Sequence, residues 1–251
     1  MCSLRFKSFP VVSPEKIYIW QIDTRVNEAT YGSLKALLSS EEQERSDRFA
    51  FDKDRFAFVV ANGVARLLLE RFTGIAVASQ RFEKNAFGKP SLVGSEWDFN
   101  ISHSGSLALC GLCQNCPIGV DVEQAKANFN PIELSEHYFS KSEKTILQET
   151  VKSKRLEAFY RCWTRKEAYI KAIGKGLSEP LDSLSVPIWG DEPGAVDIED
   201  HPLDGAQYSF GKDGERKYTI HPLDVEQVGY YAAVAYPGRV KEVLFRVWEN
   251  D

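Results

Sequence analysis

The order of apolar and polar positions along the chain predicts alternating strands and helices. Seven segments have the apolar or alternating pattern of strands: 16–22, 98–101, 107–113, 118–123, 218–222, 230–236 and 243–248. Two longer segments, Phe58 to Phe72 and Phe159 to Ile173, have the spacing of helices, and the glycine that follows each is typical of a helix end. Proline, glycine and aspartate are frequent from Leu184 to Gly214, which favours loops and short strands.

The two predicted helices belong to a repeated order of signals. Each follows a capping-box pattern, first Ser40-Glu41-Glu42-Gln43 and later Ser140-Lys141-Ser142-Glu143, in which the first serine caps a shorter helix. Setting Phe58 on Phe159 places Arg66 on Glu167 and Glu70 on Lys171, so that the charge pair is inverted. Chance similarity is the alternative explanation. The simplest architecture is an α/β fold of two related halves, residues 1–116 and 117–251.

Composition and charge restrict the class of protein. The 251 residues are 43% hydrophobic and 27% charged, which is globular and sufficient for a core. The net charge of −5 argues against a nucleic-acid binder that works by bulk phosphate attraction. No apolar run is long enough to span a bilayer, the first seven residues are too polar for a signal peptide, and five cysteines are an odd number. We therefore expect a cytosolic protein with reduced thiols.

Three carboxylates and one lysine are the strongest candidates for chemistry. In the alternating segment Gly119-Val120-Asp121-Val122-Glu123, the two acidic side chains share one face of a strand. Glu167 and Lys171, four positions apart, share one face of a helix. A solvated strand and a surface ion pair are the alternatives, but apolar residues lie on or near the helix face: Phe159, Trp163 and Ile170. Three carboxylates form an all-oxygen site that suits Mg²⁺ and not Zn²⁺.

Two further segments have weaker signals for phosphate binding. Asn100-Ile101-Ser102-His103-Ser104-Gly105 reads as a strand that runs into a turn rich in small donors. Gly88-Lys89-Pro90 fixes a lysine at a loop tip but lacks the remainder of a P-loop. The spacing Cys110-x-x-Cys113-x-x-Cys116 suggests a metal site, yet in an extended strand the middle thiol points away from the other two. These cysteines are predicted to be core or strand residues.

Together these segments resemble the Sfp-type 4′-phosphopantetheinyl transferase family. That family's signature is Gly-(Val/Ile)-Asp-x-Glu, a spacer of about forty residues, and (Phe/Trp)-(Ser/Cys/Thr)-x-Lys-Glu-(Ala/Ser)-x-x-Lys. The chain has Gly119 to Glu123 and then Trp163-Thr164-Arg165-Lys166-Glu167-Ala168-Tyr169-Ile170-Lys171. Gly88-Lys89-Pro90, the Asn100 to Gly105 segment and Gly229 to Val234 also match in order.

The resemblance implies a pseudo-dimer of two similar α/β halves with coenzyme A in the cleft between them. It implies transfer of phosphopantetheine from coenzyme A to a serine of an apo carrier protein, with release of 3′,5′-ADP (holo-acyl-carrier-protein synthase activity). The carrier would belong to a fatty-acid, polyketide or peptide synthase. Among basic residues near the second helix, the candidates for an acidic carrier's surface are Lys152, Lys154, Arg155, Arg161 and Arg165, and a solvated helix face is the alternative. We expect a monomer.

The resemblance also assigns roles to residues. Asp121, Glu123 and Glu167 would hold Mg²⁺ against the pyrophosphate, and Lys171 would contact phosphate. Glu167 is the candidate base for the serine, directly or through water, with a metal-bound hydroxide as the alternative. The remaining residues assigned to coenzyme A are Arg45, Lys84, Gly88, Lys89, Pro90, Asn100, Ile101, Ser102 and His103. Some relatives have a lysine where Glu42 stands. Arg48 and Arg55 are the candidates to replace that phosphate contact, and plain helix surface is the alternative for both.

Two competing functions use the same residues. A module that binds coenzyme A or a nucleotide but has lost catalysis is the first, although all three carboxylates and Lys171 are present. A metal-dependent phosphatase or nuclease is the second, and nothing else in the sequence favours it.

Overall fold

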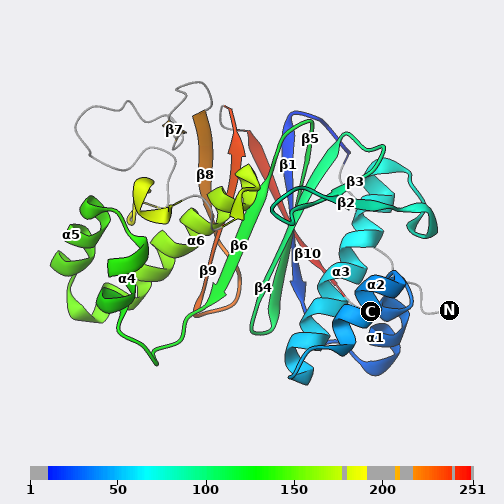
Figure 1. The fold of residues 1–251 in the computed structure, drawn as a ribbon, viewed down its shortest axis with the longest axis horizontal. Coiled ribbons are helices and arrows are strands. Elements are labelled where there is room, and N and C mark those ends of the chain that lie inside the picture. The colour runs from blue at the N-terminus through cyan, green and yellow to red at the C-terminus, as the bar shows by residue number, and fades with distance from the viewer. Residues whose placement is uncertain (1–10, 177–179, 191–206, 210–216, 239–240, 250–251) are drawn as a thin grey trace. The chain divides into compact units, whose positions relative to one another are not determined.

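The computed structural model describes residues 11–176, 180–190, 207–209, 217–238 and 241–249 (Figure 1). The chain forms two compact units, each with its own mixture of helices and strands. The first comprises described residues within Met1–Asn85, Pro90–Cys116 and Lys241–Asp251, and the second those within Ala86–Lys89 and Pro117–Val240. None of the helices in the described part of the chain has the length and apolar content needed to cross a bilayer.

The first unit is built on a four-stranded sheet with the order β10-β1-β5-β4. Its elements are β1 (Lys16–Asp23), α1 (Glu28–Lys35), α2 (Ser40–Asp47), α3 (Asp52–Thr73), the 3₁₀ helix η1 (Val77–Ser79), β2 (Phe82–Lys84), β3 (Pro90–Leu92), β4 (Trp97–Ser104), β5 (Leu107–Gln114) and β10 (Glu242–Trp248). Strand β1 is antiparallel to β5 and parallel to β10. The predicted division assigned residues 117–251 to the second half, whereas β10 pairs with β1 in the first unit.

Helix α3 packs on β4 and β5 and provides much of the first unit's core. Its buried residues Val64 and Leu68 join Trp97 and Phe99 of β4 in one apolar cluster. The helix begins at Asp52, ahead of the predicted start at Phe58, because its first turn is polar and lies outside the apolar run that defined the prediction. Its end is as predicted: Gly74 takes the left-handed conformation, with φ 72°.

The second unit has a four-stranded antiparallel sheet with the order β6-β9-β8-β7. Its elements are β6 (Gly119–Gln124), α4 (Pro131–Tyr138), α5 (Lys141–Glu149), the 3₁₀ helix η2 (Lys152–Lys154), α6 (Arg155–Ile173), the 3₁₀ helix η4 (Leu181–Ser183), β7 (Gln207–Ser209), β8 (Lys217–Leu223) and β9 (Tyr230–Pro237). Helix α6 packs against β6, β9 and β8 (Figure 1). It ends at Gly174, which has φ 69°.

Each unit has a capping box ahead of its long helix, as the sequence predicted, but the first box begins one residue earlier than expected. The first capping box is formed by Ser39 and Glu42, not by Ser40 and Gln43, because the Glu42 carboxylate accepts the Ser39 N–H at 2.8 Å. The second is formed by Ser140 and Glu143, as predicted. In each unit the capping glutamate also pairs with a buried cation of the long helix: Glu42 with Arg66, and Glu143 with Lys166.

These ion pairs fix how the two long helices correspond. Gly74 matches Gly174 and Arg66 matches Lys166 when both helices are aligned at their ends. Arg66 therefore corresponds to Lys166 and not, as predicted, to Glu167. The pair of Glu167 and Lys171 has no counterpart at the matching positions of α3, whereas the ion pair between a capping glutamate and the long helix occurs in both units.

Candidate active site

The site is positioned by an unusually close approach of β6 to α6. A Cβ atom on Gly119 would lie 2.0 Å from the Ala168 carbonyl oxygen and 2.3 Å from the Ala172 amide nitrogen. Both are backbone atoms of α6, so neither can rotate away, and only glycine permits this contact. Because Gly119 begins β6, the following alternate residues of the strand are carried beside the last turns of the helix.

Asp121 and Lys171 connect the strand to the helix through an ion pair. The Asp121 Oδ1 and Lys171 Nζ atoms lie 2.6 Å apart. The Asp121 side chain is 3% exposed and that of Lys171 is 28% exposed, so the pair lies at the edge of the interior. A carboxylate at such a depth needs a partner, and the lysine supplies a charge-assisted hydrogen bond.

Glu167 lies one helical turn before Lys171 and is half-buried. Burial raises the pKa of Glu167 above its usual range, and the charges of Asp121 and Glu123 raise it further while Lys171 opposes them. Asp121 and Glu123 therefore both lie within electrostatic reach of Glu167. In the described residues, no group of three or more histidine, cysteine, aspartate or glutamate side chains is already arranged as a metal site.

Lys89 lies at the same junction between β6 and α6. Its Nζ donates hydrogen bonds to the Ile118 carbonyl oxygen at 3.0 Å and to the Ala172 carbonyl oxygen at 2.9 Å. Gly88 before it has a φ of 87°, and Pro90 after it begins β3, so both neighbours fix the backbone around the lysine. The sequence predicted a nucleotide contact for Lys89, and the backbone contacts were missed.

The predicted phosphate-binding residues of β4 divide between the two faces of the strand. Trp97, Phe99 and Ile101 contribute to the core cluster under α3, so the alternating residues Asn100 and Ser102 face the other side of the sheet. Those two polar residues are buried, whereas His103 is exposed. The strand continues through Ser104 to a turn at Gly105, which has φ 58°. The turn thus begins later than the sequence indicated.

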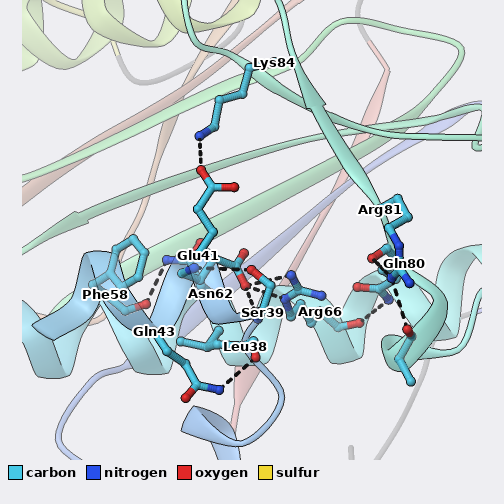
Figure 2. Close-up of polar contacts among 12 residues, drawn as sticks. Leu38, Ser39, Glu41, Gln43, Phe58, Asn62, Arg66, Gln80, Arg81 and Lys84 are labelled. Carbon is cyan, nitrogen blue, oxygen red and sulfur yellow. Dashed lines mark hydrogen bonds and ion pairs between the residues drawn. The ribbon is translucent and has the colours of Figure 1, made fainter.

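A group of basic side chains surrounds Glu41 at the start of α2 in the first unit. Lys84 of β2 reaches it, with the Nζ and Oε1 atoms 3.0 Å apart (Figure 2). The Lys84 ammonium lowers the pKa of Glu41, with smaller contributions from Arg45 and Arg48. Arg45 also lies over the Phe58 ring, with its Cζ 5.0 Å from the centroid. The structure thus brings the two predicted phosphate contacts, Arg45 and Lys84, to one neighbourhood.

Glu42 has a structural role in the first unit. It caps α2, and its Oε2 accepts a hydrogen bond from Arg66 Nε at 2.9 Å. Arg66 is buried, and its guanidinium lies over the Phe82 ring at 4.9 Å. Figure 2 shows Arg66 beside Ser39. Arg55, one of the suggested compensating residues, pairs with Asp52 at 2.6 Å.

Most of the basic residues proposed for a carrier surface are engaged within the second unit. Arg165 was wrongly expected at the surface, because it is buried and donates hydrogen bonds to the Pro187 and Gly190 carbonyls. Lys154 and Arg161 both pair with Glu157. The guanidinium of Arg155 donates to two backbone carbonyls. Lys152 is exposed.

Glu143 and Lys166 form a buried ion pair that the sequence analysis missed. Their Oε2 and Nζ atoms lie 2.7 Å apart, and the two side chains are 1% and 0% exposed. Lys166 also donates to the Leu181 and Leu184 carbonyls, and Glu143 accepts the Val186 N–H at 2.6 Å. The sequence signal for this pair was a cation at matching positions of the two long helices, Arg66 and Lys166. It was overlooked because the predicted alignment of the helices was wrong by one residue.

The cysteines of the C-x-x-C-x-x-C segment are buried thiols. Strand β5 ends at Gln114, and Asn115 takes a φ of 52°, so the chain turns before Cys116. That turn brings Cys116 against Cys113, and their hydrogen bond together with burial raises the pKa of the Cys113 thiol. The sequence had placed Cys113 on the opposite face from Cys116, which holds only while the strand is extended.

Models of known protein families match two regions of the chain. A model of the 4′-phosphopantetheinyl transferase superfamily matches residues 117–223, and one of a 4′-phosphopantetheinyl transferase N-terminal region matches residues 25–113. The 4′-phosphopantetheinyl transferase ffp of Bacillus subtilis is 34% identical over 226 residues, covering 86% of this chain and 99% of its own. Sfp of Bacillus subtilis is 31% identical, covering 74% and 82%, and HetI of Nostoc sp. is 31% identical, covering 71% and 77%.

Proposed function

The chain belongs to the 4′-phosphopantetheinyl transferase superfamily, and we propose that its reaction takes place at the junction of β6 and α6. The reaction moves 4′-phosphopantetheine from coenzyme A to a serine hydroxyl of an apo carrier protein and releases 3′,5′-ADP. The observation that carries this proposal is the 2.6 Å ion pair of Asp121 and Lys171, with Glu123 two residues along the same strand and Glu167 one turn earlier on the same helix. No observation favours a binding module without catalysis.

The donor set at this junction fits Mg²⁺. Carboxylate oxygens are the ligands this ion prefers. A cation would offset the burial of the Glu167 carboxylate and its repulsion by Asp121 and Glu123, which together raise its pKa. Asp121, Glu123 and Glu167 would hold the ion, which would neutralise charge on the pyrophosphate of coenzyme A.

The chain's own groups have distinct tasks in the transfer. Lys171, held by Asp121 at 2.6 Å, directs its ammonium toward a phosphate oxygen and stabilises the charge that develops during displacement. Glu167 accepts the proton of the carrier serine as the serine oxygen bonds to phosphorus and the bond to 3′,5′-ADP breaks. Glu167 lies one helical turn before Lys171, so the proposed base and the proposed phosphate contact share one face of α6.

The contacts to coenzyme A extend beyond this junction. The basic group around Glu41 supports phosphate contacts by Arg45 and Lys84, since both cations lie where a phosphate would replace or join the glutamate. The other proposed contacts are Gly88, Pro90, Asn100, Ile101, Ser102 and His103. Lys89, which the resemblance assigns to the nucleotide, donates to two backbone carbonyls of the protein. We further propose that acyl carrier proteins are among the acceptors, and that the enzyme is a cytosolic monomer whose buried cysteines stay reduced.

Substitution of Glu167 tests the assignment of the site. In Glu167→Gln, transfer to an apo carrier should fall at least about 100-fold, the scale of losing a catalytic acid–base or charge-stabilising group. Binding of coenzyme A, measured by calorimetry without Mg²⁺, should persist. Glu133→Gln is the matched control, because Glu133 is an exposed glutamate in the first turn of α4. Transfer at the wild-type rate in Glu167→Gln would refute the assignment.

A further inference from the structure

We propose that Lys89 is a positioning residue that fixes β6 against the last turn of α6, and so sets the geometry of the carboxylates. The inference rests on the proposed function, because it concerns the same site. It assigns Lys89 a task within the protein, in place of the nucleotide contact that the family resemblance implies.

The hydrogen bonds of Lys89 join the two elements at one point. Ile118 directly precedes β6, and Ala172 lies in the last turn of α6, one residue after Lys171. The Lys89 Nζ donates to both carbonyl oxygens, at 3.0 and 2.9 Å. The last carbonyls of a helix have no partner within the helix and carry partial negative charge. An ammonium at this place therefore stabilises the end of α6 and the start of β6 together.

The close contact at Gly119 explains why the junction of β6 and α6 depends on neighbouring groups to fix its spacing. The backbones of β6 and α6 are in direct contact there, so no side chain of Gly119 separates or interlocks the two elements. Their spacing depends on groups beside the contact, and Lys89 donates to residues on both sides of it. Asp121 lies two residues along the same strand, and Lys171 precedes Ala172. A shift of the strand along the helix would change the 2.6 Å contact between Asp121 and Lys171.

The two roles for Lys89 predict different kinetics. A residue that contacts coenzyme A contributes to binding, so its loss raises KM for coenzyme A. A residue that aligns the reacting groups contributes in the transition state, so its loss lowers kcat and leaves KM nearly unchanged. Both roles are tested in Lys89→Met, which keeps the length of the side chain and removes the charge and the donors.

The experiment compares Lys89→Met with Lys89→Arg and with a matched control. Lys144→Met is that control, because Lys144 Nζ also donates to a backbone carbonyl, that of Glu136 at 2.7 Å, between α4 and α5. We expect kcat to fall about tenfold or more in Lys89→Met, with KM for coenzyme A within about twofold, and to recover in part in Lys89→Arg. The preference for coenzyme A over 3′-dephospho-coenzyme A should not change. A tenfold rise in KM with an unchanged kcat would overturn the proposal.

Hydrogen exchange gives a readout that does not depend on activity. Amides of residues 118–124 and 168–174 should exchange faster in Lys89→Met than in the wild type or in Lys144→Met. Unchanged exchange in both segments would overturn the proposed positioning role of Lys89 even if the activity fell. If the wild-type protein transfers no phosphopantetheine, the proposed function fails, and the exchange result still decides whether Lys89 joins β6 to α6.

Discussion

Replacing Glu143 by glutamine should destabilise the protein strongly, because the change leaves the charge of Lys166 buried without its counterion. The two side chains are 1% and 0% exposed, and their charged atoms lie 2.7 Å apart. The Glu143 carboxylate also accepts the N–H groups of Ser140 and Val186, at 2.7 and 2.6 Å. A glutamine amide has one acceptor oxygen, and its NH₂ group would face a donor.

The magnitude follows from the surroundings of the lysine. Removing one partner of a buried ion pair typically costs about 3–5 kcal/mol of unfolding free energy. Lys166 keeps its hydrogen bonds to the Leu181 and Leu184 carbonyls, which partly solvate the ammonium. We therefore expect a loss near the lower limit, about 3 kcal/mol. Lys166→Met in the Glu143→Gln background should restore part of it, because the uncompensated charge is then absent.

Urea unfolding followed by circular dichroism and tryptophan fluorescence measures these differences. The double-mutant cycle isolates the coupling between the two residues. Glu149→Gln is the control, since Glu149 is an exposed glutamate of the same helix and should change stability by less than about 0.5 kcal/mol. The reasoning is wrong if Glu143→Gln lies within about 1 kcal/mol of wild type, or if the double variant is less stable than Glu143→Gln.

Two further predictions concern the core and the dependence of stability on pH. Burial lowers the pKa of His221 below its ordinary value near 6.5, because the folded protein favours the neutral imidazole. The stability that this burial contributes is therefore fully present above about pH 6.5 and is lost as the pH falls and the unfolded chain binds the proton more readily. His221→Gln should therefore lose less in Tm than wild type between about pH 7 and pH 5, and equal losses would contradict this. Leu68 is fully buried under the first sheet, so Leu68→Ala should cost about 2–5 kcal/mol in urea unfolding, and a cost below about 1 kcal/mol would mean that the cavity closes.

Local sequence patterns predicted the strand and the helix that carry the proposed site. Strand β6 and helix α6 each have a pattern that fixes which residues share a face, so Asp121, Glu123, Glu167 and Lys171 were identified before the fold was known. The ends of the long helices were also predictable, because Gly74 and Gly174 are left-handed caps.

What the sequence did not predict depends on contacts between distant segments. The pairing of β10 with β1 joins residues from opposite ends of the chain, and no local pattern encodes it. Gly119 is required by the backbone of α6, which lies about fifty residues away in sequence. The hydrogen bonds of Lys89 to Ile118 and Ala172 depend on the same packing. Such contacts decide how closely the candidate residues are held, whereas the local pattern decides only which residues they are.

The most direct test of the central claim is the intact mass of an apo carrier protein after incubation with this protein, coenzyme A and Mg²⁺. The account predicts a gain of one phosphopantetheine unit, which is absent when EDTA removes the metal and forms much more slowly in Glu167→Gln. It also predicts release of 3′,5′-ADP in equal amount. Acyl, peptidyl and aryl carriers that all stay at their apo mass, with coenzyme A still bound by the protein, would contradict it.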